Sequence, residues 1–286
     1  MSRFQLPPAE SIAADVARAL AEDVGAGDLT AGLVPATARA RATVISREAA
    51  ILCGRPWFDA VMRAVDPQLL PQWQVEEGAL MQPNQTIVTI EGAARSLLTA
   101  ERTALNFLQL LSGTATATSA YVQAVAGTQC KIVDSRKTLP GLRLAQKYAV
   151  RVGGGTNHRI GLYDGILIKE NHIATAGGVT AAMQAAQAAI AAGARPALLQ
   201  IEVETLDQLR EALAAGAPLI MLDNMDPARI RDAVAINAGR AELEVSGNVT
   251  LDTVRGYAEL GVDRISIGSL TKHVRATDFS MRMVHL

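Results

Sequence analysis

The stretch LLQIEVETLDQLREALAAGAPLIMLDN, residues 198–224, contains one complete structural repeat. A mainly apolar run over residues 198–203 precedes a helical segment that begins near Asp207 and ends at Gly216, and a second apolar run follows it. Short apolar runs that alternate with helices predict parallel strands joined by helical crossovers. This stretch therefore predicts a βα fold for the second part of the chain.

The same pattern recurs on both sides of this stretch. Further strand-like runs are CKIVDS (130–135), DGILIKE (164–170), AELEVSGN (241–248) and DRISIGS (263–269). Ile201, Ile220, Val245 and Ile267 are separated by 19, 25 and 22 residues, which is the length of a βα unit. Six readable strands predict an incomplete, atypical parallel α/β barrel, because a regular barrel has eight. A doubly wound sheet is the structural alternative.

The first part of the chain predicts an α/β (α+β) sandwich. Residues 10–25 carry apolar side chains at four-residue spacing and end at Gly25, as an amphipathic helix does. Strand-like runs over residues 40–54 and 72–92 flank a short helix over 56–65. A further helix over 95–113 is expected to end at Gly113, so we expect an N-terminal domain over 1–113 and a barrel domain over 114–274.

Composition excludes several classes of protein. A net charge of -1 gives no overall field that would recruit nucleic acid or an anionic membrane. Cys53 and Cys130 are too few for a disulfide framework or a structural zinc cluster. The start of the chain lacks the apolar segment of a signal peptide, and no apolar run approaches the ~20 residues of a membrane span. We therefore expect a cytoplasmic protein that binds neither nucleic acid nor membrane.

Basic residues follow several of the predicted barrel strands. The carboxyl ends of parallel barrel strands meet on one face, so these side chains are expected to gather there. Arginine pairs with carboxylates through two hydrogen bonds and lysine offers a point charge, which predicts a polyanionic ligand. The set comprises Arg136, Lys137, His158, Arg159 and Lys169, with Arg102 from the preceding helix. Arg143, Lys147 and Arg151 are instead expected to form a solvated basic helix face.

Acidic and small residues follow the remaining strands. Glu202 and Asp223, with Glu204 as a further candidate, provide the hard oxygen ligands that Mg²⁺ accepts together with phosphate. The same carboxylates could pair with neighbouring lysines, and both arrangements can hold in the ligand-free protein. VSGN (245–248) and SIGS (266–269) precede helices, and such glycine loops favour phosphate at a helix N-terminus. The mouth is therefore predicted to bind a phosphorylated sugar together with a diacid.

Seven segments closely resemble the quinolinate phosphoribosyltransferase family. They extend from about residue 22 to 274, with no departure at a functional position, and the central segment is the most specific. They are EDVGAGDLT (22–30), AERTALNFLQLLSG (100–113), DSRKTLPGLRLAQKYAVRVGGGTNHRIGLYDGILIKENHI (134–173), IEVET (201–205), IMLDN (220–224), EVSGNV (244–249) and ISIGSLTKHV (265–274).

The resemblance implies a decarboxylating reaction and a shared active site. Quinolinate and phosphoribosyl pyrophosphate would give nicotinate mononucleotide, pyrophosphate and CO₂ in the presence of Mg²⁺, as a step of NAD biosynthesis. The family fold implies that a C-terminal tail, residues 275–286, packs back on the N-terminal domain. It also implies a homodimer in which one subunit's N-terminal domain covers the other's barrel mouth. Whether such dimers assemble further is left open by the resemblance.

The resemblance also assigns roles residue by residue. The implied quinolinate contacts are Arg136, His158, Arg159 and Lys169, with Arg102 from the partner subunit. The implied phosphate contacts are Lys137, Ser246, Gly247, Asn248, Gly268 and Ser269, and Ser135, Thr138 and Ile267 complete the predicted substrate-binding set. Glu202 and Asp223 are the implied ribose and Mg²⁺ ligands, and these two with Lys137 form the predicted catalytic set.

Three other functions compete with this interpretation. A relative that acts on another pyridine, such as nicotinate, would need fewer cations for a single carboxylate. A Schiff-base aldolase would use Lys169 as its nucleophile, but this leaves Glu202 and Asp223 unexplained. A regulatory protein would bind phosphoribosyl pyrophosphate without turnover, and the acidic pair argues against it.

Overall fold

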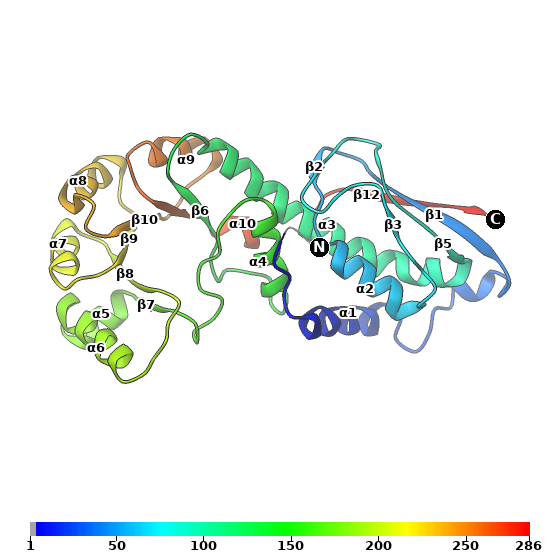
Figure 1. Ribbon diagram of the computed structural model, residues 1–286, viewed down its shortest axis with the longest axis horizontal. Helices are drawn as coiled ribbons and strands as arrows, with labels where there is room; N and C mark the ends of the chain where they lie inside the picture. The colour runs from blue at the N-terminus through cyan, green and yellow to red at the C-terminus, as the bar shows by residue number, and fades with distance from the viewer. Residues whose placement is uncertain (1–3) are drawn as a thin grey trace. The chain divides into compact units, whose positions relative to one another are not determined.

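The computed structural model describes residues 4–286, which form two compact units. The first unit comprises the chain up to Ser119, Thr138–Gly154 and Leu270–Leu286. The second comprises Ala120–Lys137 and Gly155–Ser269. The chain therefore leaves the second unit after Lys137, contributes one helix to the first, and returns at Gly155 (Figure 1).

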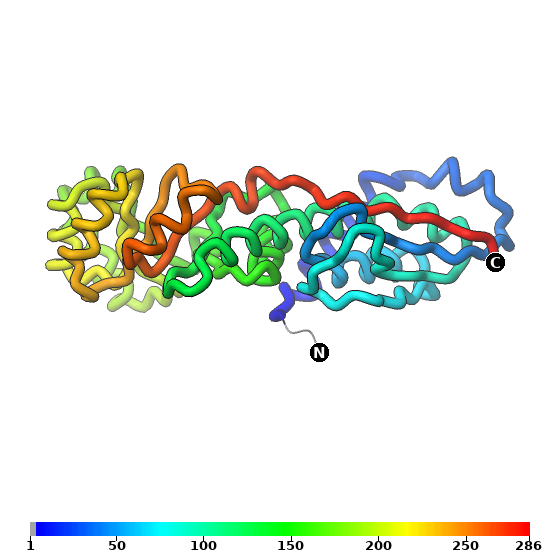
Figure 2. The backbone as a smooth tube through the Cα atoms, turned by 90° about the horizontal axis from the view of Figure 1, so that it is seen from above, coloured from blue at the N-terminus to red at the C-terminus, as the bar shows by residue number. Residues whose placement is uncertain are grey.

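The first unit contains a four-stranded antiparallel sheet in the order β12-β1-β5-β3. Its strands are β1 (Arg39–Ser46), β3 (Gln72–Trp73), β5 (Thr86–Ala93) and β12 (Phe279–His285). A second, two-stranded sheet pairs β2 (Ala50–Ile51) with β4 (Leu80–Met81). The C-terminal strand β12 pairs with β1 from Ala40 opposite His285 to Ser46 opposite Phe279, and Figure 2 shows the two side by side.

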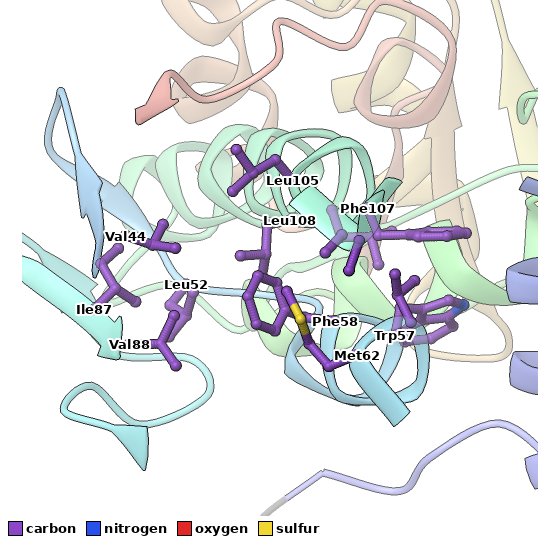
Figure 3. Packing of buried hydrophobic residues seen from close by; sticks show 14 of the residues in the cluster. Val44, Leu52, Trp57, Phe58, Met62, Ile87, Val88, Leu105, Phe107 and Leu108 are labelled. Atoms are coloured by element: carbon purple, nitrogen blue, oxygen red, sulfur yellow. The ribbon is translucent and has the colours of Figure 1, made fainter. Parts of the chain in front are cut away.

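Helices cover this sheet and share its apolar core. They are α1 (Ala9–Asp23), α2 (Arg55–Val65), α3 (Ala94–Ala124) and α4 (Arg143–Val152), with a single 3-10 turn, η1, at Ala31–Leu33. Figure 3 shows Trp57, Phe58 and Met62 of α2 among the buried side chains of α3 and β5. As predicted, α1 ends before Gly25, whose φ of 53° lies in the left-handed region that glycine tolerates.

Gly113 does not end its helix, and that part of the sequence prediction is wrong. The helix α3 continues without interruption from Ala94 to Ala124. A Cβ atom at Gly113 would collide with the backbone carbonyl oxygen of Arg275. Glycine is therefore needed here because another chain segment crosses the helix closely, and not because the helix stops.

The prediction of a solvated basic face on residues 143–151 is also wrong. Lys147 of α4 is only 2% exposed, and Gln146 beside it is completely buried. The side-chain amide of Gln146 donates to the Thr271 backbone carbonyl and its oxygen accepts from the Leu139 backbone N–H. The helix α4 is thus packed on the side that the sequence pattern assigned to solvent.

The second unit contains the predicted six-stranded sheet, in the order β6-β11-β10-β9-β8-β7 with every pair parallel. Strand order follows the chain from β7 to β11, which excludes the doubly wound alternative because that fold reverses its order at a switch point. The strands are β6 (Lys131–Val133), β7 (Ile166–Ile168), β8 (Leu199–Val203), β9 (Leu219–Asp223), β10 (Glu242–Ser246) and β11 (Arg264–Ser266).

Helices lie along the outside of these six strands (Figure 1). They are α5 (Glu170–Ala176), α6 (Val179–Ala191), α7 (Leu206–Ala214), α8 (Pro227–Asn237) and α9 (Leu251–Ala258), and a single-turn helix, α10 (Ser269–Lys272), follows β11. Thr205 and Asp226 cap α7 and α8 by accepting from the backbone N–H of Gln208 and Arg229. These caps fix where each loop at the carboxyl end of a strand gives way to helix.

A short segment, residues 155–159, closes the gap between the two edge strands. Thr156 bridges Val133 in parallel, and its backbone N–H donates to the Ile132 carbonyl at 2.8 Å. Two residues on, the His158 ring lies 2.6 Å from the side chain of Gln200 in β8. The sheet is therefore closed into an incomplete barrel, in which side-chain contacts replace part of the strand ladder.

Strand register places the polar residues of the barrel on one face. Glu202 lies opposite Met221, and Met221 lies opposite Glu244. Because side chains alternate along a strand, Gln200, Asp223 and Ser246 share this inner face with them. The alternate residues, Ile201, Leu222 and Val245 among them, are buried and apolar. The inner face thus carries Gln200, Glu202 and Asp223 toward the mouth, with Met221 between them.

Candidate active site

The second unit holds the predicted site residues, except Arg102 and Thr138. Arg102 lies exposed on α3 in the first unit. The Thr138 hydroxyl accepts a hydrogen bond from Arg143 Nε at 3.2 Å. Of the further acidic candidates, Glu204 lies exposed beyond the end of β8, where its backbone N–H donates to Gln208.

The ends of β7 and β8 meet in an ion pair. Lys169 Nζ lies 2.7 Å from Glu202 Oε2, and the two side chains are 43% and 9% exposed. Register explains the contact, because Ile168 lies opposite Ile201 and the next residue of each strand points to the inner face. The sequence interpretation that pairs an acidic residue with a neighbouring lysine is correct for Glu202.

Asp223, at the end of β9, has a different partner. Its Oδ2 accepts a hydrogen bond of 2.7 Å from Asn224 Nδ2, and the Asn224 backbone N–H donates to the Ser246 carbonyl. Gly247 has a φ of 108°, and a Cβ atom there would collide with the side chain of Asn224. Glycine at position 247 is therefore required for the contact that orients Asp223. Asn248, the next residue, has a φ of 48°.

Lys137 and Ser135 lie against the loop that follows β11. A Cβ atom at Gly268 would come within 3.0 Å of Lys137 Cδ and 3.5 Å of Ser135 Oγ. The Ser135 hydroxyl also accepts from the Lys137 backbone N–H at 3.1 Å. The adjacent Ile267 is buried, and Ser269 begins α10, which is only four residues long. The helix N-terminus is therefore a smaller part of the predicted phosphate site than the sequence suggests, and the Lys137 side chain is a larger part.

Arg136 and Arg159 form a pair of neighbouring cations. Burial lowers the pKa of Arg159, the charge of Arg136 lowers it further, and Asp164 raises it. Arg159 Nη1 donates to the Gly165 carbonyl at 3.0 Å, which directs the guanidinium along the start of β7. Two partly desolvated like charges repel, so this arrangement suits an anion with more than one negative charge.

Two buried residues that no sequence pattern marked hold this part of the site. Asp134, at the end of β6, is fully buried and accepts from the His158 backbone N–H at 2.8 Å and from Asn157 Nδ2 at 2.6 Å. Gln200 is fully buried and contacts His158 Nε2. The signal for Gln200 was its position two residues before Glu202, because alternate residues of a strand face the same side.

The two carboxylates of the inner face suit a cation that takes most of its ligands from elsewhere. Within residues 4–286, no group of three or more His, Cys, Asp or Glu side chains could hold a metal ion. Mg²⁺ commonly takes only one or two protein carboxylates and completes its shell with phosphate and water. Glu202 and Asp223 on the inner face provide two such oxygen donors, so the donor set suits Mg²⁺ and not a closed protein cage.

Closed parallel barrels with phosphate-binding loops after the last strands form a recurrent class of enzyme fold. Within this class, the chain matches the two models of one family. Residues 28–112 match "Quinolinate phosphoribosyl transferase, N-terminal domain" and residues 114–282 match its "C-terminal domain". This protein therefore belongs to the quinolinate phosphoribosyltransferase family.

Individual relatives agree with this assignment. The nicotinate-nucleotide pyrophosphorylase [carboxylating] of Mycobacterium leprae is 43% identical over 277 residues, which cover 93% of this chain and 95% of the relative. The solved nicotinate-nucleotide pyrophosphorylase from Francisella tularensis is 42% identical, has a TM-score of 0.94, and is matched over 99% of this chain and 100% of its own. NadC from Streptococcus pyogenes is 40% identical with a TM-score of 0.93, over 99% of both chains.

Proposed function

We propose that this protein transfers a phosphoribosyl group from phosphoribosyl pyrophosphate to quinolinate and releases pyrophosphate and CO₂. The product is nicotinate mononucleotide, a precursor of NAD. Family membership supports the reaction class, and the relatives' name, nicotinate-nucleotide pyrophosphorylase [carboxylating], supports the same chemistry. The residues at the barrel strand ends support a division of the site between the two substrates.

The observation that carries the proposal is the arrangement of the cations around β6 and β7. Arg136 is close enough to Arg159 for its charge to lower the Arg159 pKa. Arg159 also donates to the Gly165 carbonyl just before β7, the strand that Lys169 follows. Quinolinate has two adjacent carboxylates, whereas nicotinate has one. A dianion would neutralise the repulsion between the two guanidiniums, so the site favours quinolinate over a monoacid.

The phosphate and ribose groups would lie toward β9, β10 and β11. Lys137 and Ser135 beside Gly268 provide a cation and a hydroxyl for the pyrophosphate, and Ser246, Gly247 and Asn248 line the neighbouring strand end. Glu202 and Asp223 would accept hydrogen bonds from the ribose hydroxyls. Their negative charge would also stabilise the positive charge that develops at ribose C1 as the leaving group departs.

No enzymic nucleophile is needed in this reaction. The quinolinate ring nitrogen donates its electron pair to ribose C1, and the C1–O bond to pyrophosphate breaks with its electrons leaving on oxygen. The ring then carries a positive charge, so it accepts the electrons released when the C2 carboxylate departs as CO₂. A proton at C2 completes the product. The chain's contribution is to hold the two substrates in line and to offset these charges.

Magnesium would act with Glu202 and Asp223. When bound with pyrophosphate, Mg²⁺ withdraws negative charge from the leaving group. Glu202 would hold the metal once its contact with Lys169 is exchanged, since Nζ of that lysine lies 2.7 Å from Oε2 of Glu202. Quinolinate would provide the alternative anion for Lys169.

The proposed assembly is a homodimer with shared active sites. Arg102 lies exposed on α3, so it is available to a second copy of the chain. We also place the protein in the cytoplasm. Cys53 and Cys130 are both free thiols, which agrees with a reducing compartment. In the part of the chain that the structure describes, no helix is long and apolar enough to cross a membrane.

A Schiff-base aldolase is the less favoured alternative. Its lysine must be free to attack a carbonyl, whereas Lys169 Nζ lies 2.7 Å from the Glu202 carboxylate. Borohydride in the presence of a carbonyl substrate would trap an adduct on Lys169 if the aldolase were correct. No such adduct is expected.

Product analysis tests the proposed function directly. Purified protein with Mg²⁺, phosphoribosyl pyrophosphate and quinolinate should form nicotinate mononucleotide, detected by mass spectrometry. Nicotinate in place of quinolinate should give no nucleotide. Equal turnover of both pyridines would contradict the argument from paired cations.

A further inference from the structure

The segment that closes the barrel is held by a chain of buried hydrogen bonds. The His158 backbone N–H donates to Asp134 Oδ1 at 2.8 Å, and the Arg159 backbone N–H donates to His158 Nδ1 at 2.8 Å. His158 Nε2 lies 2.6 Å from Gln200 Oε1. His158 is 7% exposed and Gln200 is completely buried. Both ring nitrogens of His158 are therefore engaged within the protein.

These contacts select one tautomer of the imidazole. Because Nδ1 accepts the Arg159 N–H, it carries no proton, so the proton of the neutral ring lies on Nε2. Nε2 then donates to Gln200 Oε1, which is an acceptor only. The alternative tautomer would set two donors against each other at Arg159 and leave Gln200 Oε1 without its donor.

We propose that Gln200 is a positioning residue for quinolinate binding, and this proposal rests on the proposed function. Gln200 holds His158 as the Nε2–H tautomer, and His158 in turn fixes the backbone of Arg159. Arg159 is thereby held beside Arg136 in the geometry that receives a dianion. Gln200 touches no substrate in this account and acts through His158 alone.

The surroundings of Gln200 explain why an amide occupies this position. Its side chain lies near the carboxyl of Glu244, which is also fully buried. An amide presents an oxygen to the histidine and an NH₂ group toward Glu244. A carboxylate at position 200 would lie beside a second buried carboxylate and would favour a proton on His158 Nδ1, which removes the acceptor for Arg159. Glutamine provides the acceptor for His158 and adds no charge beside Glu244.

The test combines kinetics with the protonation state of His158. Gln200→Met keeps the length of the side chain and removes its acceptor. The KM for quinolinate should rise roughly 10-fold, as expected when one buried hydrogen bond is lost, while kcat and the KM for phosphoribosyl pyrophosphate change little. In ¹⁵N NMR spectra, His158 of the wild-type protein should show Nε2 protonated and Nδ1 bare, and the variant should show a mixture. Gln187→Met, on the exposed face of α6, is the matched control and should leave all of these values unchanged.

Three results would overturn the proposal. One is a folded Gln200→Met protein with a normal quinolinate KM. Another is a variant in which kcat and both KM values change together, as a purely structural defect would cause. The third needs no variant: a proton on Nδ1 of His158 in the wild-type protein excludes the mechanism even if Gln200→Met does not fold. A wild-type protein that fails to use quinolinate would instead contradict the proposed function.

Discussion

Lys169 and Glu202 neutralise each other across the ends of β7 and β8, with Nζ and Oε2 2.7 Å apart. Both residues are assigned to substrates in our account, the lysine to quinolinate and the glutamate to ribose and Mg²⁺. Each is therefore occupied by the other before the substrates arrive. Substrate binding must exchange this internal pair for two separate contacts.

This exchange predicts opposite effects of one substitution on binding and on turnover. Glu202→Gln removes the competitor for Lys169, so quinolinate should bind at least as tightly as before, by up to about 10-fold more tightly. The same change removes a negative charge near ribose C1, so kcat should fall by about 100-fold or more. Calorimetry and steady-state kinetics on one preparation measure both quantities.

Lys169→Met is the companion variant for this prediction. It should weaken quinolinate binding and leave the nearly buried Glu202 without its cation. If Glu202→Gln weakened quinolinate binding as Lys169→Met does, the two residues would act as one structural unit. The prediction that substrates replace the Lys169–Glu202 pair would then be wrong.

Arg159→Ala should weaken quinolinate binding far more than nicotinate binding. The loss of a partly desolvated carboxylate partner costs about 2–5 kcal/mol. Binding of phosphoribosyl pyrophosphate should change little, since Lys137 and the loops after β10 and β11 are intact. Titration calorimetry with each ligand provides the measurement. An Arg159→Ala protein with normal affinity for quinolinate would remove this arginine from the diacid site.

Much of the second unit could be predicted from the sequence. Short apolar runs and acidic helix starts are local signals, and they correctly gave six parallel strands. The barrel was predicted, but the segment that closes it was not. Residues 155–159 contain a single bridge, at Thr156, and their contact with β8 is made by side chains distant in sequence. Gly113 misled for a related reason: a glycine that allows close packing looks in sequence like one that ends a helix.

The charged residues at the strand ends were predicted, whereas the buried residues that hold them were not. Lys137 follows a strand, and Glu202 and Asp223 lie at the ends of theirs, so all three could be selected by position. Asp134 and Gln200 act through buried hydrogen bonds to His158, and no local pattern shows which residue lies opposite them. The first unit shows the same limit, since the burial of Lys147 depends on tertiary packing.

Glu244 predicts a specific dependence of stability on pH. Burial, and in smaller part the charge of Asp134, raise the pKa of Glu244, while Arg264, Ser266 and Gln200 oppose the rise. A carboxyl whose pKa is raised in the folded state stabilises the protein fully below its ordinary value of 4.5, and this stability is lost as pH rises toward the folded value.

Glu244→Gln should therefore gain stability over the wild-type protein as pH rises through that window. The free energy of unfolding should increase by about 1.4 kcal/mol relative to wild type for each pH unit of the window. Thermal unfolding of both proteins from pH 4 to 8 measures this difference. Arg264 also contacts Glu242, so Glu242→Gln separates the loss of an ion pair from the loss of the buried charge. A difference between Glu244→Gln and wild type that does not vary with pH would contradict the argument.

The proposed shared site predicts that two inactive variants rescue each other. Arg102→Ala and Lys169→Ala homodimers should each be nearly inactive. A heterodimer would have one site with both changes and one site with neither, given the two-fold pairing expected of such dimers. Isolated with two affinity tags, it should have about half of wild-type activity, and an unfractionated mixture about a quarter. A verified heterodimer that stays inactive would mean that Arg102 does not act across the interface.

The central claim is that two paired cations, Arg136 after β6 and Arg159 before β7, bind a diacid, which then loses one carboxylate during phosphoribosyl transfer. Quinolinate labelled with ¹⁴C in the C2 carboxylate tests this claim most directly. In the presence of Mg²⁺, we predict labelled CO₂ in equal amount to the nicotinate mononucleotide formed, and only when phosphoribosyl pyrophosphate is present. Label in the C3 carboxylate should stay in the nucleotide. Nucleotide formation without CO₂, or CO₂ release without phosphoribosyl pyrophosphate, would contradict the account.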